Sequence, residues 1–375
     1  MIKDTLGMIY TGEDSYHLRD LCSKRPIAAI PIWGRYRAID FLLTNLVNSG
    51  VGNVGVIAQQ NYNSLMDHLG SGKAWDLDRK RYGLRILPPY IDSSSSSTGY
   101  TGIVDALQRT MTYIRHAPQR YVILSGSSVL FKSTFDDALA QHVATNADIT
   151  VFYKDATPAE MSAMVDGDFI QLREDNRIWD FEINPASPHS NQVMMNVFIL
   201  EKSLLEYLIG EAFAHNEHNF TEGILMKRVK DLRLYGYDYK GYVARLDSVQ
   251  SYFKHSMKIL EPEMRQEIFY ENGPVYTKVK DEVPTRYENG SHVSNSMIAD
   301  GCVIEGSVED SILFRSVHIA PGAVVKNCVI MQGSEIQSGA VLENVIIDKS
   351  AIIRRDRHLV GQENYPVLIG KNAIV

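Results

Sequence analysis

The chain has 375 residues, of which 45% are hydrophobic and 22% are charged, which is the composition of an ordinary globular protein long enough for two domains. Its formal net charge of −7 argues against a general nucleic-acid binder. Three widely spaced cysteines favour reduced thiols over a disulfide framework or a zinc site. The N-terminus lacks the apolar core of a signal peptide, and no apolar run is long enough to span a bilayer. We therefore expect a cytoplasmic protein without membrane contact.

Alternating strand and helix patterns predict an α/β domain in the first part of the chain. Residues 6–10 are predicted to be a strand and residues 51–58 a buried parallel strand, and apolar residues at helical spacing predict a helix over 39–47. Arg35 and Arg37 precede this helix, where cations suit a phosphate; a solvated surface turn is the alternative. The serine-rich residues 93–97 predict a mobile loop. Further strands are predicted at residues 121–126, 148–153, 167–172 and 177–182.

The period of the sequence changes in the last quarter of the chain. Val324, Ile330, Ile336 and Leu342 fall six residues apart, with glycines and small residues at the turns between them. This hexapeptide repeat predicts a left-handed parallel β-helix, whose stacked coils bury a continuous aliphatic core. We expect an α/β domain over residues 1–255, a linker over 256–289 and a β-helix over 290–375.

Residues 31–51, PIWGRYRAIDFLLTNLVNSGV, resemble the PFGGKYRIIDFxLSNCxNSGI segment of the ADP-glucose pyrophosphorylases (glucose-1-phosphate adenylyltransferases). The match is long and ungapped, and later segments extend the resemblance over nearly the whole chain. It implies a Rossmann-like (GT-A-like) nucleotidyltransferase domain with a mixed sheet, followed by the β-helix. It also implies a role in glycogen biosynthesis, where ATP and glucose 1-phosphate yield ADP-glucose and pyrophosphate with the help of Mg²⁺.

The chain departs from this family at the positions that carry the chemistry. The family's glycine-rich loop is here residues 11–15, TGEDS, with one glycine and two carboxylates where phosphates would lie. Ile27 and Asn184 stand where the family has two lysines of the site. Ser127 and Arg245 stand where it has two metal-binding aspartates. Neither a neutral hydroxyl nor a guanidinium is a suitable Mg²⁺ ligand, so we expect no retained catalytic residue and no retained metal site.

Other site positions of the family are kept. Gln59 matches the glutamine that reads the adenine edge; a polar residue at a strand end is the alternative. Gly102 and Asp105 match the family's GTADA segment and are candidate substrate-binding residues. Asp105 could instead be kept because it meets the dipole of a helix start. Asp247 could replace a lost metal ligand only with a partner carboxylate.

Retained folding positions together with lost charges resemble the GlgD-type regulatory subunit of bacterial ADP-glucose pyrophosphorylase. The resemblance implies a non-catalytic or weakly active chain that modulates a catalytic paralogue in a hetero-oligomer, such as a heterotetramer. It also implies an allosteric sugar-phosphate effector, for which Arg35, Arg37 and Arg354 are candidate ligands, with a solvated charge cluster as the alternative at Arg354. The alternatives are an active sugar-1-phosphate nucleotidyltransferase and a hexapeptide acyltransferase. For the acyltransferase the candidate histidines are His292, His318 and His358.

Overall fold

The computed structural model describes residues 2–89 and 99–375, and the serine-rich loop predicted at 93–97 lies outside this part of the chain. The chain divides into two compact units, the first from residues 1–14 and 41–243 and the second from residues 15–40 and 244–375. The predicted linker, residues 256–289, contains the helix α9 (Pro262–Phe269). The domain boundaries that the sequence predicts at residues 255 and 290 remain predictions. None of the helices in the described part of the chain has the length and apolar character needed to cross a bilayer.

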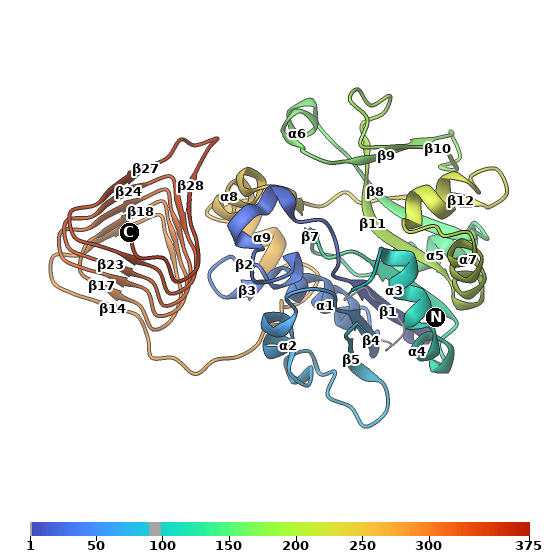
Figure 1. Cartoon of the computed structure of the whole chain (residues 1–375), viewed down its shortest axis with the longest axis horizontal. Helices are drawn as coiled ribbons and strands as arrows, with labels where there is room; N and C mark the ends of the chain where they lie inside the picture. The colour runs from blue at the N-terminus through green and yellow to red at the C-terminus, as the bar shows by residue number, and fades with distance from the viewer. Residues whose placement is uncertain (1, 90–98) are drawn as a thin grey trace. The chain divides into compact units, whose positions relative to one another are not determined.

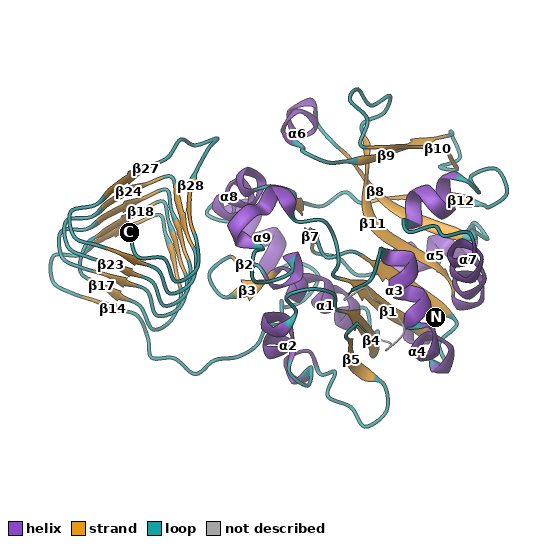
Figure 2. Cartoon of the chain, viewed as in Figure 1, coloured by secondary structure: helices purple, strands orange, loops and turns teal. Residues whose placement is uncertain are grey.

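In the described part of the first unit, nine strands form one mixed sheet (Figure 2). The strands β6, β1, β4 and β5 lie side by side and run parallel; β6, β1 and β4 match strands that the sequence predicts, whereas β5 is not predicted. The long strand β11 pairs antiparallel with both β6 and β8, which makes the sheet mixed. The nine strands are β1 (Thr5–Tyr10), β4 (Asn53–Ile57), β5 (Gly83–Leu87), β6 (Tyr121–Ser125), β8 (Ile149–Asp155), β9 (Asp168–Leu172), β10 (Ile178–Ile183), β11 (Gln192–Glu201) and β12 (Leu234–Asp238).

Helices cover this sheet and bury the central strands. Every residue of β1 is buried, because a central parallel strand has helices or loops on both faces. Its side chains Leu6, Met8 and Tyr10 share one hydrophobic core with residues of α3, α4 and α7. The helices are α1 (Ala38–Asn48), α2 (Asn63–Leu69), α3 (Ile103–Arg109), α4 (Met111–His116), α5 (Asp136–Ala144), α6 (Pro158–Ala163), α7 (Lys202–Ala214) and, in the second unit, α8 (Val249–Lys258).

The second unit contains the β-helix, drawn as stacked coils in Figure 1. Its described strands form three parallel sheets of five strands each, the architecture that the hexapeptide repeat predicts. One sheet holds β14 (Arg286–Tyr287), β17 (Val303–Ile304), β20 (His318–Ile319), β23 (Glu335–Ile336) and β26 (Ile352–Ile353). The second holds β15 (His292–Ser294), β18 (Ser307–Glu309), β21 (Val324–Lys326), β24 (Val341–Glu343) and β27 (His358–Val360). The third holds β16 (Met297–Ile298), β19 (Ile312–Leu313), β22 (Val329–Ile330), β25 (Val345–Ile347) and β28 (Val367–Ile369).

One residue of the predicted repeat does not belong to the core of the β-helix. Ile330, Ile336 and Leu342 are buried as predicted, but the prediction for Val324 is wrong, because its side chain is 41% exposed. The adjacent Val325 is buried and pairs in register with Leu342 on the next coil. The two positions are 342 − 325 = 17 residues apart, one fewer than three hexapeptides, and this shortening moves the inward position by one residue.

Residues 15–40 belong to the second unit and pack on its β-helix and helices. The short hairpin β2 (Pro31–Ile32) and β3 (Tyr36–Arg37) turns at Trp33 and Gly34, and the Trp33 indole N–H donates to the backbone oxygen of His255 at 3.0 Å.

The remaining short elements of the chain are β7 (Val129–Phe131), β13 (Val243–Arg245) and the short helical segments Ile2–Asp4, Tyr16–Leu21, Ile27–Ala29, Lys73–Trp75 and Thr221–Met226.

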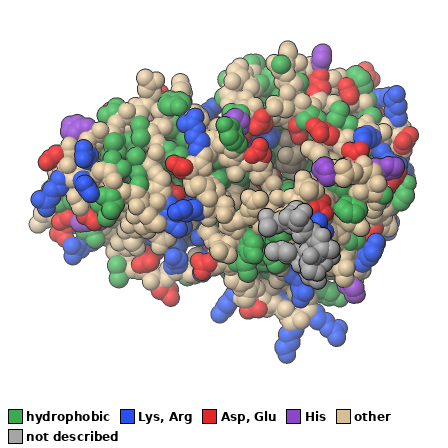
Figure 3. Space-filling view, viewed as in Figure 1, with side chains coloured by type: hydrophobic (Ala, Val, Ile, Leu, Met, Phe, Trp, Pro, Cys, Tyr) green, Lys and Arg blue, Asp and Glu red, His purple; other side chains and the backbone are tan. Residues whose placement is uncertain are grey.

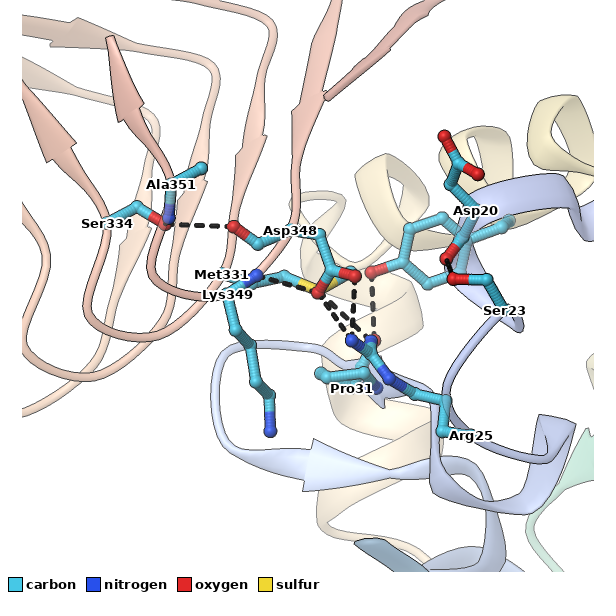
Figure 4. A network of polar contacts seen from close by, with 10 residues as sticks. Asp20, Ser23, Arg25, Pro31, Met331, Ser334, Asp348, Lys349 and Ala351 are labelled. Carbon is cyan, nitrogen blue, oxygen red and sulfur yellow. Dashed lines mark hydrogen bonds and ion pairs between the residues drawn. The ribbon is translucent and has the colours of Figure 1, made fainter. Parts of the chain in front are cut away.

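A buried ion pair ties this segment to the β-helix (Figure 4). The Nη2 atom of Arg25 donates to both carboxylate oxygens of Asp348 at 2.7 Å. Asp348 also accepts the backbone N–H of Lys349 at 2.6 Å. The side chains of Arg25 and Asp348 are only 4% and 1% exposed, so each charge depends on the other for its compensation.

Candidate functional site

A cavity of about 310 Å³ opens in the first unit beside the carboxyl ends of β1 and β6. In α/β proteins this edge of a parallel sheet is where ligands bind. The lining includes Tyr10, Glu13, Gly102, Asn196 and His218. Asn196 has a φ of 54°, in the left-handed region that asparagine tolerates better than most residues.

The carboxylate of Glu13 is bound by the two serines that follow β6. The backbone N–H groups of Ser127 and Ser128 donate to its two oxygens at 2.6 and 3.1 Å. The hydroxyl groups of the same serines donate to the same oxygens at 2.5 and 2.6 Å. Glu13 therefore lies across the strand end where the resemblance places a metal-binding aspartate.

The residues around Glu13 do not fit the Mg²⁺ ion that the family implies. A carboxylate has about four lone-pair positions, and four donors already occupy those of Glu13. In the described part of the chain, no three His, Cys, Asp or Glu residues gather in a group that could hold a metal ion. Mg²⁺ needs an anionic oxygen that is free to coordinate it. The described residues around Ser127 supply no such oxygen.

Both polar groups of Gln59 are engaged within the first unit. Its side-chain oxygen accepts the Tyr10 hydroxyl at 2.9 Å, and its amide nitrogen donates to the backbone oxygen of Tyr100 at 2.9 Å. The half-buried amide thus links Tyr10, at the end of β1, to the backbone of Tyr100. To read an adenine edge as predicted, Gln59 would first have to release one of these bonds.

Gly102 and Asp105 form the start of α3. A Cβ atom on Gly102 would lie 2.4 Å from the backbone oxygen of His218, so only glycine fits at this wall of the cavity. The buried Asp105 accepts the backbone N–H of Thr101 at 3.1 Å and Nε of Arg109 at 2.7 Å. These contacts favour the structural alternative for Asp105, since its carboxylate holds the backbone just before α3 and pairs with Arg109 within the helix.

The other positions with lost charge are not among the residues that line this cavity. Asn184 is exposed at the end of β10, where its φ is 41° and its amide nitrogen donates to Asp166 at 3.0 Å. Ile27 is 2% exposed and belongs to the core of the second unit. Arg245 ends β13 and is half-buried. Asp247 precedes α8, and its carboxylate accepts the hydroxyl of Ser248 at 3.1 Å.

The candidate effector cations of the second unit lie in two places, with Arg35 and Arg37 just before α1 and Arg354 on the β-helix. Arg35 is exposed and stacks on the Tyr36 ring, with 5.3 Å from the guanidinium carbon to the ring centre. The backbone N–H of Arg37 donates to the buried carboxylate of Asp40 at 3.0 Å, so the first turn of α1 already has an anion of its own. Burial, together with Arg37 and Arg25, lowers the pKa of Lys349 to about 7.

Arg354 lines a separate shallow hollow on the β-helix with Arg355 and Arg357. Asp356 lies among these cations. On the face visible in Figure 3, Lys and Arg side chains alternate with Asp and Glu instead of forming one continuous cationic area.

The three histidines considered for acyl transfer are not gathered at one place on the β-helix. His292 and His358 belong to the first and last strands of one sheet, and His318 belongs to another sheet. Nε2 of His318 lies 2.7 Å from the Glu305 carboxylate.

Comparison with known proteins agrees with this architecture. A nucleotidyl transferase family model matches residues 6–261, and a GlmU-like C-terminal hexapeptide model matches residues 281–365. The glycogen biosynthesis protein GlgD of Bacillus subtilis is 34% identical over 373 residues, which cover 98% of this chain and 96% of that protein. The glucose-1-phosphate adenylyltransferase of Halalkalibacterium halodurans is 32% identical over 372 residues, with the same coverage of 98% and 96%. A GlgD protein of Geobacillus stearothermophilus is 36% identical over 320 residues, 85% of this chain and 82% of that protein.

Fold and comparisons together define a nucleotidyltransferase domain that is followed by a hexapeptide β-helix. More narrowly, the chain belongs to the nucleotidyl transferase family, in the group formed by the glucose-1-phosphate adenylyltransferases and the glycogen biosynthesis proteins GlgD.

Proposed function

We propose that the chain is a catalytically deficient regulatory subunit that modulates a catalytic glucose-1-phosphate adenylyltransferase in glycogen biosynthesis. The observation that carries this proposal is the Glu13 carboxylate, whose lone pairs are filled by donors from Ser127 and Ser128. Adenylyl transfer depends on positioned phosphates and metal charge rather than on covalent chemistry by the protein. At this strand end the chain offers a carboxylate whose oxygens are already hydrogen-bonded instead of a free metal ligand.

The remaining substitutions support the same proposal. Ile27 and Asn184 carry no charge where the family has lysines, and Arg245 carries the opposite charge from the family's aspartate. The loss of one preorganised charge at a reaction centre typically lowers the rate by about 10²–10³, and such losses do not simply add. Several losses together leave little useful turnover, whereas the residues that build the sheet and the β-helix are intact.

The proposed partner is a catalytic paralogue from the adenylyltransferase group, to which this chain is similar in sequence. We propose that the two chains form a hetero-oligomer. A sugar-phosphate effector is proposed to bind the second unit at one of two places, beside Arg35 and Arg37 or in the hollow that Arg354 lines. Burial, and after it the repulsion from Arg37 and Arg25, lowers the pKa of Lys349 to about 7, so positive charge is gathered near Arg37.

The test is to measure pyrophosphate release from ATP and glucose 1-phosphate with Mg²⁺ by the catalytic paralogue alone and by its mixture with this chain. We expect the chain to raise the partner's rate or to shift its response to sugar phosphates, and the effect to saturate at a fixed ratio of the two chains. Albumin at equal concentration controls for non-specific stabilisation. A mixture that behaves as the sum of its separate components over the whole titration contradicts the proposal.

The effector part of the proposal has a separate test. Arg354→Ala should weaken the sugar-phosphate response of the mixture, because Arg354 is one of the proposed ligands. Arg286→Ala is the matched control: it removes an exposed arginine from the same β-helix, where Arg286 pairs with Glu288 at 2.7 Å. Equal effector responses in the two variants would exclude Arg354 from effector binding.

A further inference from the structure

The outward face of α7 carries no exposed charge. The exposed residues of this helix are Ser203, Tyr207, Gly210, Phe213 and Ala214, and the side chains of Tyr207 and Phe213 are 58% and 46% exposed. The opposite face of the helix is buried in the hydrophobic core of the first unit. A surface helix usually presents charged and polar side chains to solvent. Two exposed aromatic rings with no exposed charge between them are typical of a surface that binds another protein.

Gly210 lies between the two rings, three residues from each of them. A Cβ atom added to Gly210 would meet no described atom within 4 Å, so packing within the chain does not require a glycine here. Glycine destabilises the interior of a helix relative to alanine, so this residue weakens α7 without a compensating contact of its own. A glycine on an exposed helix face does allow a second helix to approach closely.

The charged residues beside this face already have partners within the first unit. The carboxylate of Glu206 accepts from Nε of Arg115 at 3.2 Å, and the carboxylate of Glu211 pairs with Arg228. The guanidinium carbon of Arg228 also lies 5.7 Å from the centre of the Tyr207 ring, and this cation–π contact holds the ring in place. The face is therefore ordered in the free chain, and covering it leaves neither carboxylate without a counter-charge.

We propose that this face of α7 binds the same face of a second copy of the chain, as an antiparallel pair of helices that cross at Gly210. Tyr207 and Phe213 lie equally far along the helix on either side of Gly210. A two-fold axis at Gly210 therefore places Tyr207 of one copy level with Phe213 of the other. The antiparallel order also brings opposite ends of the two helix dipoles together. The proposal concerns self-association alone and does not rest on the regulatory role.

The charge of the chain favours a second copy at this face. The formal net charge is −7, so two copies repel each other on average, and the repulsion is smallest where the two surfaces that meet are uncharged. The helix has 13 residues and is about 20 Å long. A pair of this length buries less than the roughly 1,200 Å² of a stable interface, so we expect a weak dimer with a Kd of about 10–100 µM.

The main experiment is disulfide cross-linking of the full chain under mild oxidation. The chain's own cysteines, Cys22, Cys302 and Cys328, are buried, so an introduced surface thiol reacts without competition from them. Gly210→Cys brings two thiols together at the crossing and should form a disulfide-linked dimer at least about tenfold faster than Ser203→Cys. Ser203 is the matched control, because it lies on the same exposed face of α7. In the antiparallel pair its two copies are about 21 Å apart.

Sedimentation velocity at protein concentrations from about 1 to 200 µM measures the self-association of the unmodified chain. Tyr207→Gln should weaken this association at least about tenfold, because it removes a central aromatic side chain from the interface. Tyr270→Gln makes the same change at a tyrosine of the second unit that is 74% exposed, and it should associate as the wild type does. The comparison of the two variants reports on α7 alone, whatever other surfaces of the chain contribute.

Three results would overturn the proposal. Equal rates of cross-linking for Gly210→Cys and Ser203→Cys would indicate random collision or a parallel pair. Equal self-association of Tyr207→Gln and Tyr270→Gln, including its absence in both, would exclude this face of α7 from the contact. In an equimolar mixture with the catalytic paralogue, faster cross-linking of Gly210→Cys to the paralogue than to itself would assign the face to that protein instead of a second copy.

Discussion

Removing the carboxylate of Asp348 should destabilise the second unit strongly, because it leaves the buried guanidinium of Arg25 without a counter-charge. The side chains of Arg25 and Asp348 are 4% and 1% exposed, and the Nη2 atom of Arg25 lies 2.7 Å from each carboxylate oxygen. Asp348 also accepts the backbone N–H of Lys349 at 2.6 Å. Breaking a buried pair from one side typically costs about 3–5 kcal/mol, and we expect Asp348→Ala to lower the free energy of unfolding by that amount.

The assay is urea unfolding of Asp348→Ala, Arg25→Met and the double variant, read as a double-mutant cycle on the transition of the second unit. The double variant should recover much of the loss, since no unpaired charge remains buried in it. Glu288→Gln is the control, because it breaks an exposed pair in the same unit and should cost under about 1 kcal/mol. An Asp348→Ala variant as stable as this control would refute the reasoning.

Three further predictions concern the lost charges, a lysine and the β-helix core. Ser127→Asp combined with Arg245→Asp should not restore normal pyrophosphate release. The carboxylate introduced at position 127 faces that of Glu13, and the two lysines of the family's site are still missing. A normal rate would show that those lysines are dispensable. Burial, together with Arg37 and Arg25, lowers the pKa of Lys349 from 10.5 to about 7, so the unfolded chain binds more protons between these values. The free energy of unfolding should therefore rise with pH from about 7 to 10, by at most about 1.4 kcal/mol per pH unit, and Lys349→Met should flatten this rise in urea titrations. Leu342→Ala should lower the free energy of unfolding by about 2–5 kcal/mol in the same urea titration, because Leu342 is buried. Val324→Ala should lower it by under about 1 kcal/mol, because Val324 is 41% exposed. Equal losses in the two variants would contradict the 17-residue coil.

Much of the fold could be predicted because it depends on local patterns. The apolar residues of 39–47 predict a helix, and the structure has α1 (Ala38–Asn48). The six-residue spacing likewise predicts a β-helix, because each coil repeats the same local requirement for an inward aliphatic side chain. Val324 was misplaced because coil length varies along the β-helix, and a change of one residue leaves the local pattern almost unaltered.

The candidate site could be predicted only in part. The resemblance identifies which positions of the family have lost their charge, but it does not say what replaces them. Glu13 and Ser127 are 114 positions apart, and no rule of spacing joins a loop carboxylate to serines at such a distance. The sequence does show a carboxylate, Glu13, in the phosphate loop and two adjacent serines after β6. Only the structure shows that these serines bind that carboxylate.

The most direct test of the account is whether the chain alone can carry out adenylyl transfer. We would measure pyrophosphate release by the purified chain with ATP, glucose 1-phosphate and Mg²⁺, with the catalytic paralogue as the positive control. The account predicts no turnover above the rate without protein, because Glu13 is bound by Ser127 and Ser128 instead of holding a metal. Turnover at an ordinary enzyme rate, about 1–10³ per second, would contradict it.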